Sequence, residues 1–402
     1  PTVTYVEDAR MAKAEVRAFS TVTRVLTNQA GTRATGVEYY DAKKERQVQE
    51  ADVVILAAWS AQNPRILLNS VTDKHPKGLA NKNELVGKYM MTHSIAGTWA
   101  LFDEDITPHM GTIGAQFMSY DRYAKTSYPN AFGSTFMVCG AAMKTTDYAN
   151  ARGDLFGPEL AAFMKRAARG ITRITCFGEG LPHSENRIEL SEQKDEFGLP
   201  LARLIHSFDD DAVALWNANF EQGIKIAKAT GAKEVWPGRG PVIPTTHLHG
   251  GAIMGTGAEN SVTNSYGQTH EVPNLWMAGP CIFPSEGASN PTYTIFAVSQ
   301  RGAELAFIRG KQIGDLSTKL SDVETNLLTK IADNEKAGLS RDEATQKAVT
   351  DLATEFGVAK EDLLKQIGAT ETTLNERVNT LQKTFTEQVG TLETNILTKM
   401  AE

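Results

Sequence analysis

The sequence predicts a mixed α/β (α+β) fold that combines an open Rossmann-like domain, a mainly antiparallel β domain and an α-helical tail. Residues 53–58 (VVILAA) are apolar on both faces, which is typical of a central strand in a parallel sheet. Residues 85–242 contain many short alternating segments, which favour an antiparallel sheet. No Pro, Trp, Tyr, His or Cys occurs beyond residue 310, which indicates long helices.

The first seventy residues predict a small helix followed by strands. We expect a helix over residues 3–14, a turn at Ala30-Gly31 and a short helix from Asn63 to Leu68. Strands are expected at residues 15–20, 23–28, 35–41 and 46–58.

The next region predicts strands and then one long helix. Strands are expected at residues 94–102, 132–143, 172–179 and 187–190. Three aspartates at 209–211 should cap a helix over residues 212–230, and Gly231 should end it. Its apolar stripe has helical spacing and predicts a core face: Val213, Trp216, Phe220, Ile224 and Ala227.

Residues 247–302 contain the polar groups best placed for binding. A His-bearing strand, a Gly-Gly turn and a buried strand over 274–278 precede a loop rich in Gly, Pro and Ser, and a helix then begins near Thr292. A strand's carboxyl end that meets a helix N-terminus is the usual ligand crevice of open α/β sheets. No G-x-G-x-x-G fingerprint occurs before this segment.

Two histidines, His247 and His249, lie at positions i and i+2 of the predicted strand, so both should face the same side. Histidine suits general-base catalysis because its unperturbed pKa lies near working pH. The residues alone leave two other readings of the pair open, namely a metal half-site and two hydrogen-bonded core histidines.

Composition excludes several classes of function. The chain has 402 residues and is 41% hydrophobic, enough for two or more domains. A net charge of −7 gives no basic footprint for nucleic acid. Cys139, Cys176 and Cys281 lack C-x-x-C spacing, so no metal site and no disulfide framework is indicated. The chain shows no signal peptide and no apolar run of membrane-spanning length, and no compartment can be assigned.

The tail carries nearly all the net charge. From Asp315 to Glu402 there are 10 Lys and Arg against 16 Asp and Glu. Apolar residues recur from Leu374 to Ile396 at spacings of 4, 3, 4, 4, 3 and 4, close to heptads. Residues 324–332 are echoed at 393–401. We expect an oligomeric coiled coil that resembles phage-fibre segments; an amphipathic helix pair folded back on the body is the alternative.

Four ordered stretches carry a family resemblance: TRATGVEYYD with EADVVILAAWSAQNPRILLNS, NELVGKYMMTH, THLHGGAIMG, and NLWMAGPCIFPSEGASNPTYTIFAVSQRGAELA. Over residues 1–310 they resemble the glucose–methanol–choline (GMC) family of flavoprotein oxidoreductases, especially its sugar-acid and polyol dehydrogenase branch.

The resemblance implies FAD as cofactor and oxidation of a CH–OH group, with hydride transfer to flavin N5. It implies His247 as the base, three residues before the Gly-Gly turn, and Asn290 as the residue that hydrogen-bonds the substrate hydroxyl. The cofactor contacts that it implies are Val22, Ala57, Ala58, Gly279, Pro280, Pro291 and Thr292. Trp59 replaces a small residue of the family pattern. His249 stands where the family is usually apolar, and His93 and His270 are expected at the surface or beside the site.

The family's Gly-rich diphosphate loop has no counterpart here, so we expect a fragment of a longer protein that does not hold FAD tightly alone. The expected divisions are residues 1–72 (middle of the FAD domain), 73–240 (substrate domain), 241–312 (end of the FAD domain) and 313–402 (coiled-coil tail).

The expected function is oxidation of a sugar, sugar acid, polyol or other alcohol, with an unidentified electron acceptor and a homo-oligomer formed through the tail. The alternative is a structural or attachment protein in which the tail carries the function.

Overall fold

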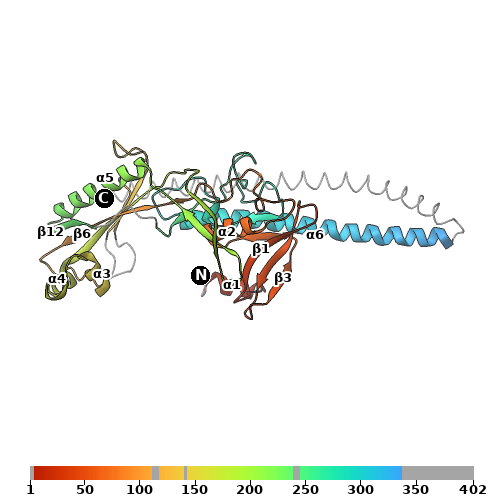
Figure 1. Cartoon of the computed structure of the whole chain (residues 1–402), viewed down its shortest axis with the longest axis horizontal. Helices are drawn as coiled ribbons and strands as arrows, with labels where there is room; N and C mark the ends of the chain where they lie inside the picture. Colours follow the sequence, from red (N-terminus) through yellow and green to blue (C-terminus); the bar gives the residue numbers. More distant parts are fainter. Residues whose placement is uncertain (1–3, 111–116, 140–142, 239–244, 337–402) are drawn as a thin grey trace, which may run out of the picture. The chain divides into compact units, whose positions relative to one another are not determined.

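The computed structural model describes residues 4–110, 117–139, 143–238 and 245–336 (Figure 1). Contacts divide the chain into two compact units, Pro1–Gln312 and Ile313–Glu402. The expected mixture of helices with antiparallel and parallel strands is present in the described residues. The heptad pattern and the second copy of the repeat lie outside those residues, so the coiled coil stays a prediction.

The chain begins with helix α1 (Tyr5–Met11) and an antiparallel sheet, which consists of β1 (Thr21–Thr27), β2 (Ala34–Tyr40) and β3 (Arg46–Glu50). The strand expected at residues 15–20 is wrong. That segment is irregular, and Phe19 takes a positive φ of 53° with 82% of its surface exposed. No strand of the described residues pairs with it, so no ladder there offsets the cost of extending it.

The single strand expected over residues 46–58 is divided in two. Strand β3 stays in the first sheet, whereas β4 (Val54–Leu56) pairs in parallel with β14 (Leu275–Met277). The side chain of Asn274, which precedes β14, links the first sheet to the segment before β4. Its amide donates to the Asp52 carbonyl at 2.8 Å and to the Ala34 carbonyl at 2.7 Å. The expected parallel pairing is confirmed, but Ile55 is 44% exposed, so β4 is not covered on both faces by the described residues.

A five-stranded antiparallel sheet has the order β12-β6-β9-β8-β7. Its strands are β6 (Ser94–Leu101), β7 (Phe117–Ser119), β8 (Thr135–Cys139), β9 (Ile171–Gly178) and β12 (Glu234–Pro237). A hairpin of β10 (Arg187–Lys194) and β11 (Pro200–Ile205) follows β9. The antiparallel sheet expected from the alternating pattern is therefore present.

The two faces of this sheet are covered differently (Figure 1). Helix α5 (Asp210–Ala229) packs on the face that contains Ala96, Ala100 and Ile174. Helices α3 (Thr145–Ala151) and α4 (Gly157–Gly170) form a cluster with Trp99, Leu101 and Ile171, at one end of the opposite face. Side chains alternate along a strand, so the odd-numbered residues of β6 and β9 share this second face.

Helix α5 forms where the sequence predicts it. The Asp209 side chain accepts from the Ala212 amide at 2.8 Å, which is the expected N-cap. Trp216, Phe220 and Ala227 pack into the core, whereas Val213 is 39% exposed, so its place in the predicted stripe is wrong. The buried face is centred on Leu215, which the predicted stripe omitted.

The last part of the first unit contains short elements and the beginning of one long helix. Strand β13 (Leu248–His249) pairs with β5 (Met91–Thr92), and η1 (Pro280–Ile282) follows β14. Helix α2 (Trp59–Asn69) starts earlier than expected, and α6 (Thr292–Lys336) begins at the expected residue. In the described part of the chain, no helix combines the length and apolar character needed to span a bilayer.

Replacement of Gly250 by alanine should destabilise the protein by at least about 2 kcal/mol. Gly250 has φ of 72°, and a Cβ there would lie 2.0 Å from the Tyr89 carbonyl oxygen. Gly198 is the matched control, because it has φ of 78° but nothing within 4 Å of a Cβ. Gly198→Ala should cost only the backbone strain, about 1 kcal/mol. Equal losses in urea unfolding would contradict the steric role of Gly250.

Candidate active site

The pairing of β5 with β13 brings two histidines together. Leu248 lies opposite Thr92 in this antiparallel ladder, so the next position sets His93 opposite His247. Their Nδ1 atoms are 3.1 Å apart, and the rings are nearly perpendicular at 88°. Phe177 of β9 stacks on His247 with ring centroids 5.8 Å apart. The site is thus assembled from β5, β13 and the five-stranded sheet.

His93 is fully buried. The expected surface position is therefore wrong, and the alternative expectation, a position beside the site, is correct. Its Nε2 lies 2.7 Å from the carbonyl oxygen of Gly287. A carbonyl oxygen only accepts, so His93 donates from Nε2. Burial lowers the pKa of His93, with the other two histidines adding to that effect, so the ring is neutral near pH 7.

The protonation of His93 determines that of His247. A neutral imidazole with its proton on Nε2 has a bare Nδ1, which must accept. His247 therefore donates from Nδ1 to His93. Burial first, and His249 second, lower the pKa of His247, so it too is neutral and its Nε2 keeps a lone pair.

His249 forms a second buried contact with Glu286. His249 Nδ1 lies 2.6 Å from Glu286 Oε2, with angles that do not meet those of a hydrogen bond. Burial raises the pKa of Glu286 to about 8 and lowers the pKa of His249 to about 4. Both groups are therefore neutral near pH 7, since each avoids a desolvated charge.

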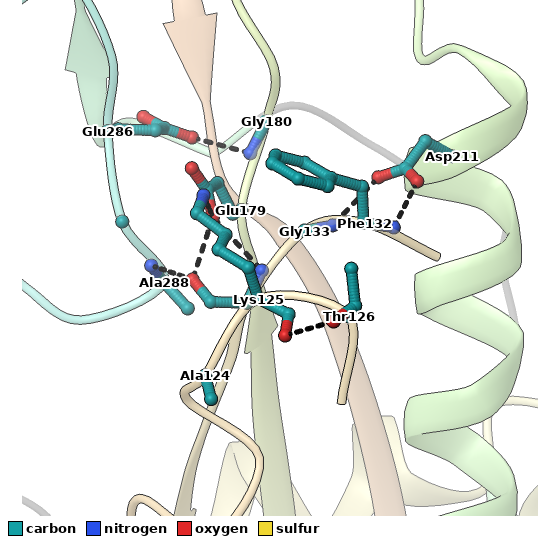
Figure 2. A network of polar contacts seen from close by, with 12 residues as sticks. Ala124, Lys125, Thr126, Phe132, Gly133, Glu179, Gly180, Asp211, Glu286 and Ala288 are labelled. Carbon is teal, nitrogen blue, oxygen red and sulfur yellow. Dashed lines mark hydrogen bonds and ion pairs between the residues drawn. The ribbon is translucent and has the colours of Figure 1, made fainter. Parts of the chain in front are cut away.

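Polar contacts fasten the loop that carries Glu286 to the five-stranded sheet (Figure 2). Glu286 Oε1 accepts from the Gly180 amide at 2.8 Å. The Ser134 hydroxyl donates to Glu179 at 2.7 Å and accepts from the Ala288 amide at 3.1 Å. Glu179 is buried and also pairs with Lys125, whose ammonium offsets its charge.

Four of the expected cofactor contacts meet at the carboxyl ends of β4 and β14. Ala57 and Ala58 follow β4 and are exposed, and Gly279 and Pro280 follow β14. Asn63 joins the two ends: the Ala58 amide donates to its Oδ1 at 2.7 Å, and its Nδ2 donates to the carbonyls of Leu56 and Ala278 at 3.2 Å. The sequence interpretation missed Asn63 as a site residue, although it placed this polar residue at the start of a short helix that follows the apolar strand.

The other expected residues are spread around this edge. Asn290, Pro291 and Tyr293 line a cavity of about 570 Å³ with Glu286 and Gly287. Asn290 is exposed, and the described residues include no hydrogen bond between it and His247. Val22 lies on β1, in a different sheet from β4 and β14. Trp59, expected at a strand end, is instead the first residue of α2, with φ of 74°.

His270 donates to or accepts from the Ser261 hydroxyl at 2.9 Å and takes no part in the histidine cluster. No group of three or more potential metal ligands occurs among the described residues.

Two sequence profiles described as GMC oxidoreductase match residues 2–95 and 182–299, which together make up more than half of the chain. The chain belongs to the GMC oxidoreductase family. The first match includes His93, and the second includes His247, Glu286 and Asn290.

Sequence comparison also finds dehydrogenases among the similar proteins. The chain is 32% identical over 331 residues to 2-methyl-1,2-propanediol dehydrogenase of Mycolicibacterium austroafricanum, covering 80% of this chain and 59% of that protein. It is 29% identical to the gluconate 2-dehydrogenase flavoprotein of Pantoea cypripedii, covering 73% and 50%. The chain therefore spans between half and two thirds of the length of these relatives.

The solved structure of a formate oxidase from Aspergillus oryzae RIB40 superposes with a TM-score of 0.55 at 13% identity, covering 73% of this chain and 60% of that one. This likeness shows a shared fold.

The free energy of unfolding should fall as pH rises from 6.5 to 8, because of Glu286. Its folded-state pKa of about 8 lies above the usual 4.5, so its contribution is complete below pH 4.5 and is lost through pH 8. His249 has the opposite sign: its contribution is complete above pH 6.5 and is lost as pH falls through 4.

Glu286→Gln should remove this fall, because an amide does not titrate. Urea unfolding of both proteins between pH 6.5 and 8 measures it, with Glu189→Gln on the partly exposed hairpin pair as control. Parallel stability curves for wild type and Glu286→Gln would contradict a neutral buried carboxyl.

Proposed function

We propose that this protein is an FAD-dependent oxidoreductase of alcohol CH–OH groups, with His247 as the base. The observation that carries the proposal is the hydrogen bond from His247 Nδ1 to His93, which leaves Nε2 as an acceptor. Membership of the GMC family supports the reaction class. It favours the enzyme over the attachment-protein alternative.

The residues at the carboxyl ends of β4 and β14 fit a flavin. Gly279 has φ of 101°, and no atom lies within 4 Å of a Cβ there, so a ligand can approach its backbone closely. Pro291 precedes α6, and the first N–H groups from Thr292 have no partner within the helix. That positive helix end would favour the negative charge of a reduced flavin. Ala57, Ala58 and Pro280 would complete this edge, and Val22 would contact the adenine end.

The chemistry divides between cofactor and protein. When bound, FAD supplies the acceptor for the hydride that leaves the carbinol carbon. His247 takes the hydroxyl proton on Nε2, so the alcohol loses one proton and one hydride and becomes a carbonyl compound. Asn290 would hold the hydroxyl oxygen by a hydrogen bond. We also propose that residues 1–72 and 241–312 form the flavin domain, residues 73–240 the substrate domain and residues 313–402 a helical coiled-coil tail that joins copies of the chain.

His247→Gln should slow substrate-driven flavin reduction by about 10²- to 10⁴-fold while flavin content is unchanged, because the proton loses its acceptor. Anaerobic stopped-flow absorbance on the full-length protein measures the rate. His270→Gln, outside the cluster, is the matched control. Reduction at the wild-type rate in His247→Gln would remove His247 from the reaction.

His93→Leu should lower kcat about 10- to 100-fold with little change in KM, because His247 loses the acceptor that fixes its tautomer. His93→Asn should restore part of kcat, since an amide oxygen accepts at a similar position. Steady-state kinetics separate the two parameters. A raised KM with unchanged kcat would show that His93 serves binding instead.

A further inference from the structure

We propose that Arg173 binds the carboxylate of the substrate, and that the protein therefore acts on polyhydroxylated carboxylic acids. This inference rests on the proposed oxidation at His247 and names the substrate class of that site.

Arg173 lines a cavity of about 1,040 Å³ beside the five-stranded sheet. Trp99 and Trp236 line the same cavity, and the guanidinium carbon of Arg173 lies 5.3 Å from the Trp99 ring centroid. The cavity thus combines two aromatic side chains with a lining that is otherwise largely polar and charged.

Among the described residues, Arg173 is the ionisable side chain of this cavity that forms no ion pair. Arg152 pairs with Asp154 at 2.8 Å, Glu234 pairs with Arg166, and Lys233 lies 4.0 Å from Asp103. Arg173 forms no such pair, and its buried Nε has no hydrogen-bond partner.

A guanidinium stays charged in a protein, so burying one without a partner is unfavourable. Burial lowers the pKa of Arg173, and the nearby Asp147 only partly opposes this effect. A bound anion would supply the missing partner.

Arg173 shares one face of the sheet with the histidine site. Along β9, the odd-numbered residues Ile171, Arg173, Thr175 and Phe177 point to the same face. Ile171 is covered by the α3–α4 cluster, and Phe177 is covered by His247. Arg173 lies between these two covers, so a ligand bound to it would extend along this face of the sheet toward His247.

The guanidinium leans toward His247. A Cβ on Gly97 would lie 2.4 Å from Nε and Nη2 of Arg173, so the side chain rests over Gly97. Gly97 pairs with Thr175, two residues before Phe177. Two residues of strand span about 7 Å, so the guanidinium lies about that far along the strand from Phe177, on which His247 stacks. The absence of a side chain at residue 97 is what leaves room for this position.

A carboxylate fits this group best. The planar guanidinium binds carboxylate through two parallel N–H bonds and can do so while its face lies over an aromatic ring such as Trp99. A neutral polyol would leave the buried charge unpaired.

Isothermal titration of the full-length, flavin-loaded protein with gluconate and with its neutral alditol, sorbitol, tests the proposal. Arg173→Gln should weaken gluconate binding about 10- to 100-fold, since hydrogen bonds to charged groups are the strong ones, and should leave sorbitol binding unchanged. Gly97→Ala provides a second variant, because its Cβ displaces the guanidinium and keeps the charge. It should also weaken gluconate binding.

Arg152→Gln is the matched control, because Arg152 lines the same cavity but already has Asp154 as its partner. It should change gluconate binding less than about threefold. Equal gluconate affinity in wild type, Arg173→Gln and Gly97→Ala would overturn the proposal. Tighter binding of glucose 6-phosphate than of gluconate would overturn the carboxylate assignment.

Flavin reduction by gluconate, measured on the same samples, separates the two proposals. His247→Gln should bind gluconate as wild type does and fail to reduce the flavin. Arg173-dependent gluconate binding without any oxidation by wild-type protein would contradict the proposed function and support the anion site.

Discussion

The register of a two-residue ladder, β5 with β13, determines the chemistry of the histidine cluster. Because Leu248 lies opposite Thr92, His247 falls opposite His93. Gly250 makes this register feasible, since any side chain there would overlap the Tyr89 carbonyl. The Gly287 carbonyl then fixes the proton on His93 Nε2, and the proton of His247 follows on Nδ1. The carbonyl oxygen of Gly287 thereby sets the tautomer of His247, which lies one residue before β13.

Burial has different consequences in two parts of the first unit: it favours neutral side chains around His247, and it leaves the Arg173 guanidinium without an ion pair among the described residues. Around His247, the imidazoles of His93 and His249 and the carboxyl of Glu286 are all shifted toward their neutral forms, so the cluster carries no net charge before it accepts a proton. On the same sheet face, the guanidinium of Arg173 forms no ion pair with the described residues, and its buried Nε has no hydrogen-bond partner among them. A neutral base and an isolated cation on one strip of sheet suit a substrate with a hydroxyl at one end and a negative charge at the other.

The sequence predicted the fold where one segment carries its own signal. The acidic cap of α5 and the start of α6 at Thr292 are local patterns, and both predictions are confirmed. The apolar run of β4 correctly predicted parallel pairing, but among the described residues the strand is not central and is not covered on both faces. The predicted strand at residues 15–20 and the unbroken strand over 46–58 are wrong because partners distant in sequence, such as Asn274, decide where pairing occurs. His93 could not be placed in the cluster from sequence, since its role arises from a ladder between segments over 150 residues apart. The structural roles of three further residues also become clear only once their burial is known: Asn63, Glu286 and Arg173.

The most direct measurement is the protonation state of the two paired histidines. Two-bond ¹H–¹⁵N correlation spectra of protein labelled with ¹⁵N-histidine report which ring nitrogen carries the proton, and His93→Gln and His247→Gln samples assign the signals. The hydrogen-bond pattern predicts neutral rings at pH 7.5, with His93 protonated on Nε2 and His247 protonated on Nδ1. A His247 ring protonated on Nε2 would contradict its role as the base, because the nitrogen proposed to accept the substrate proton would already hold one.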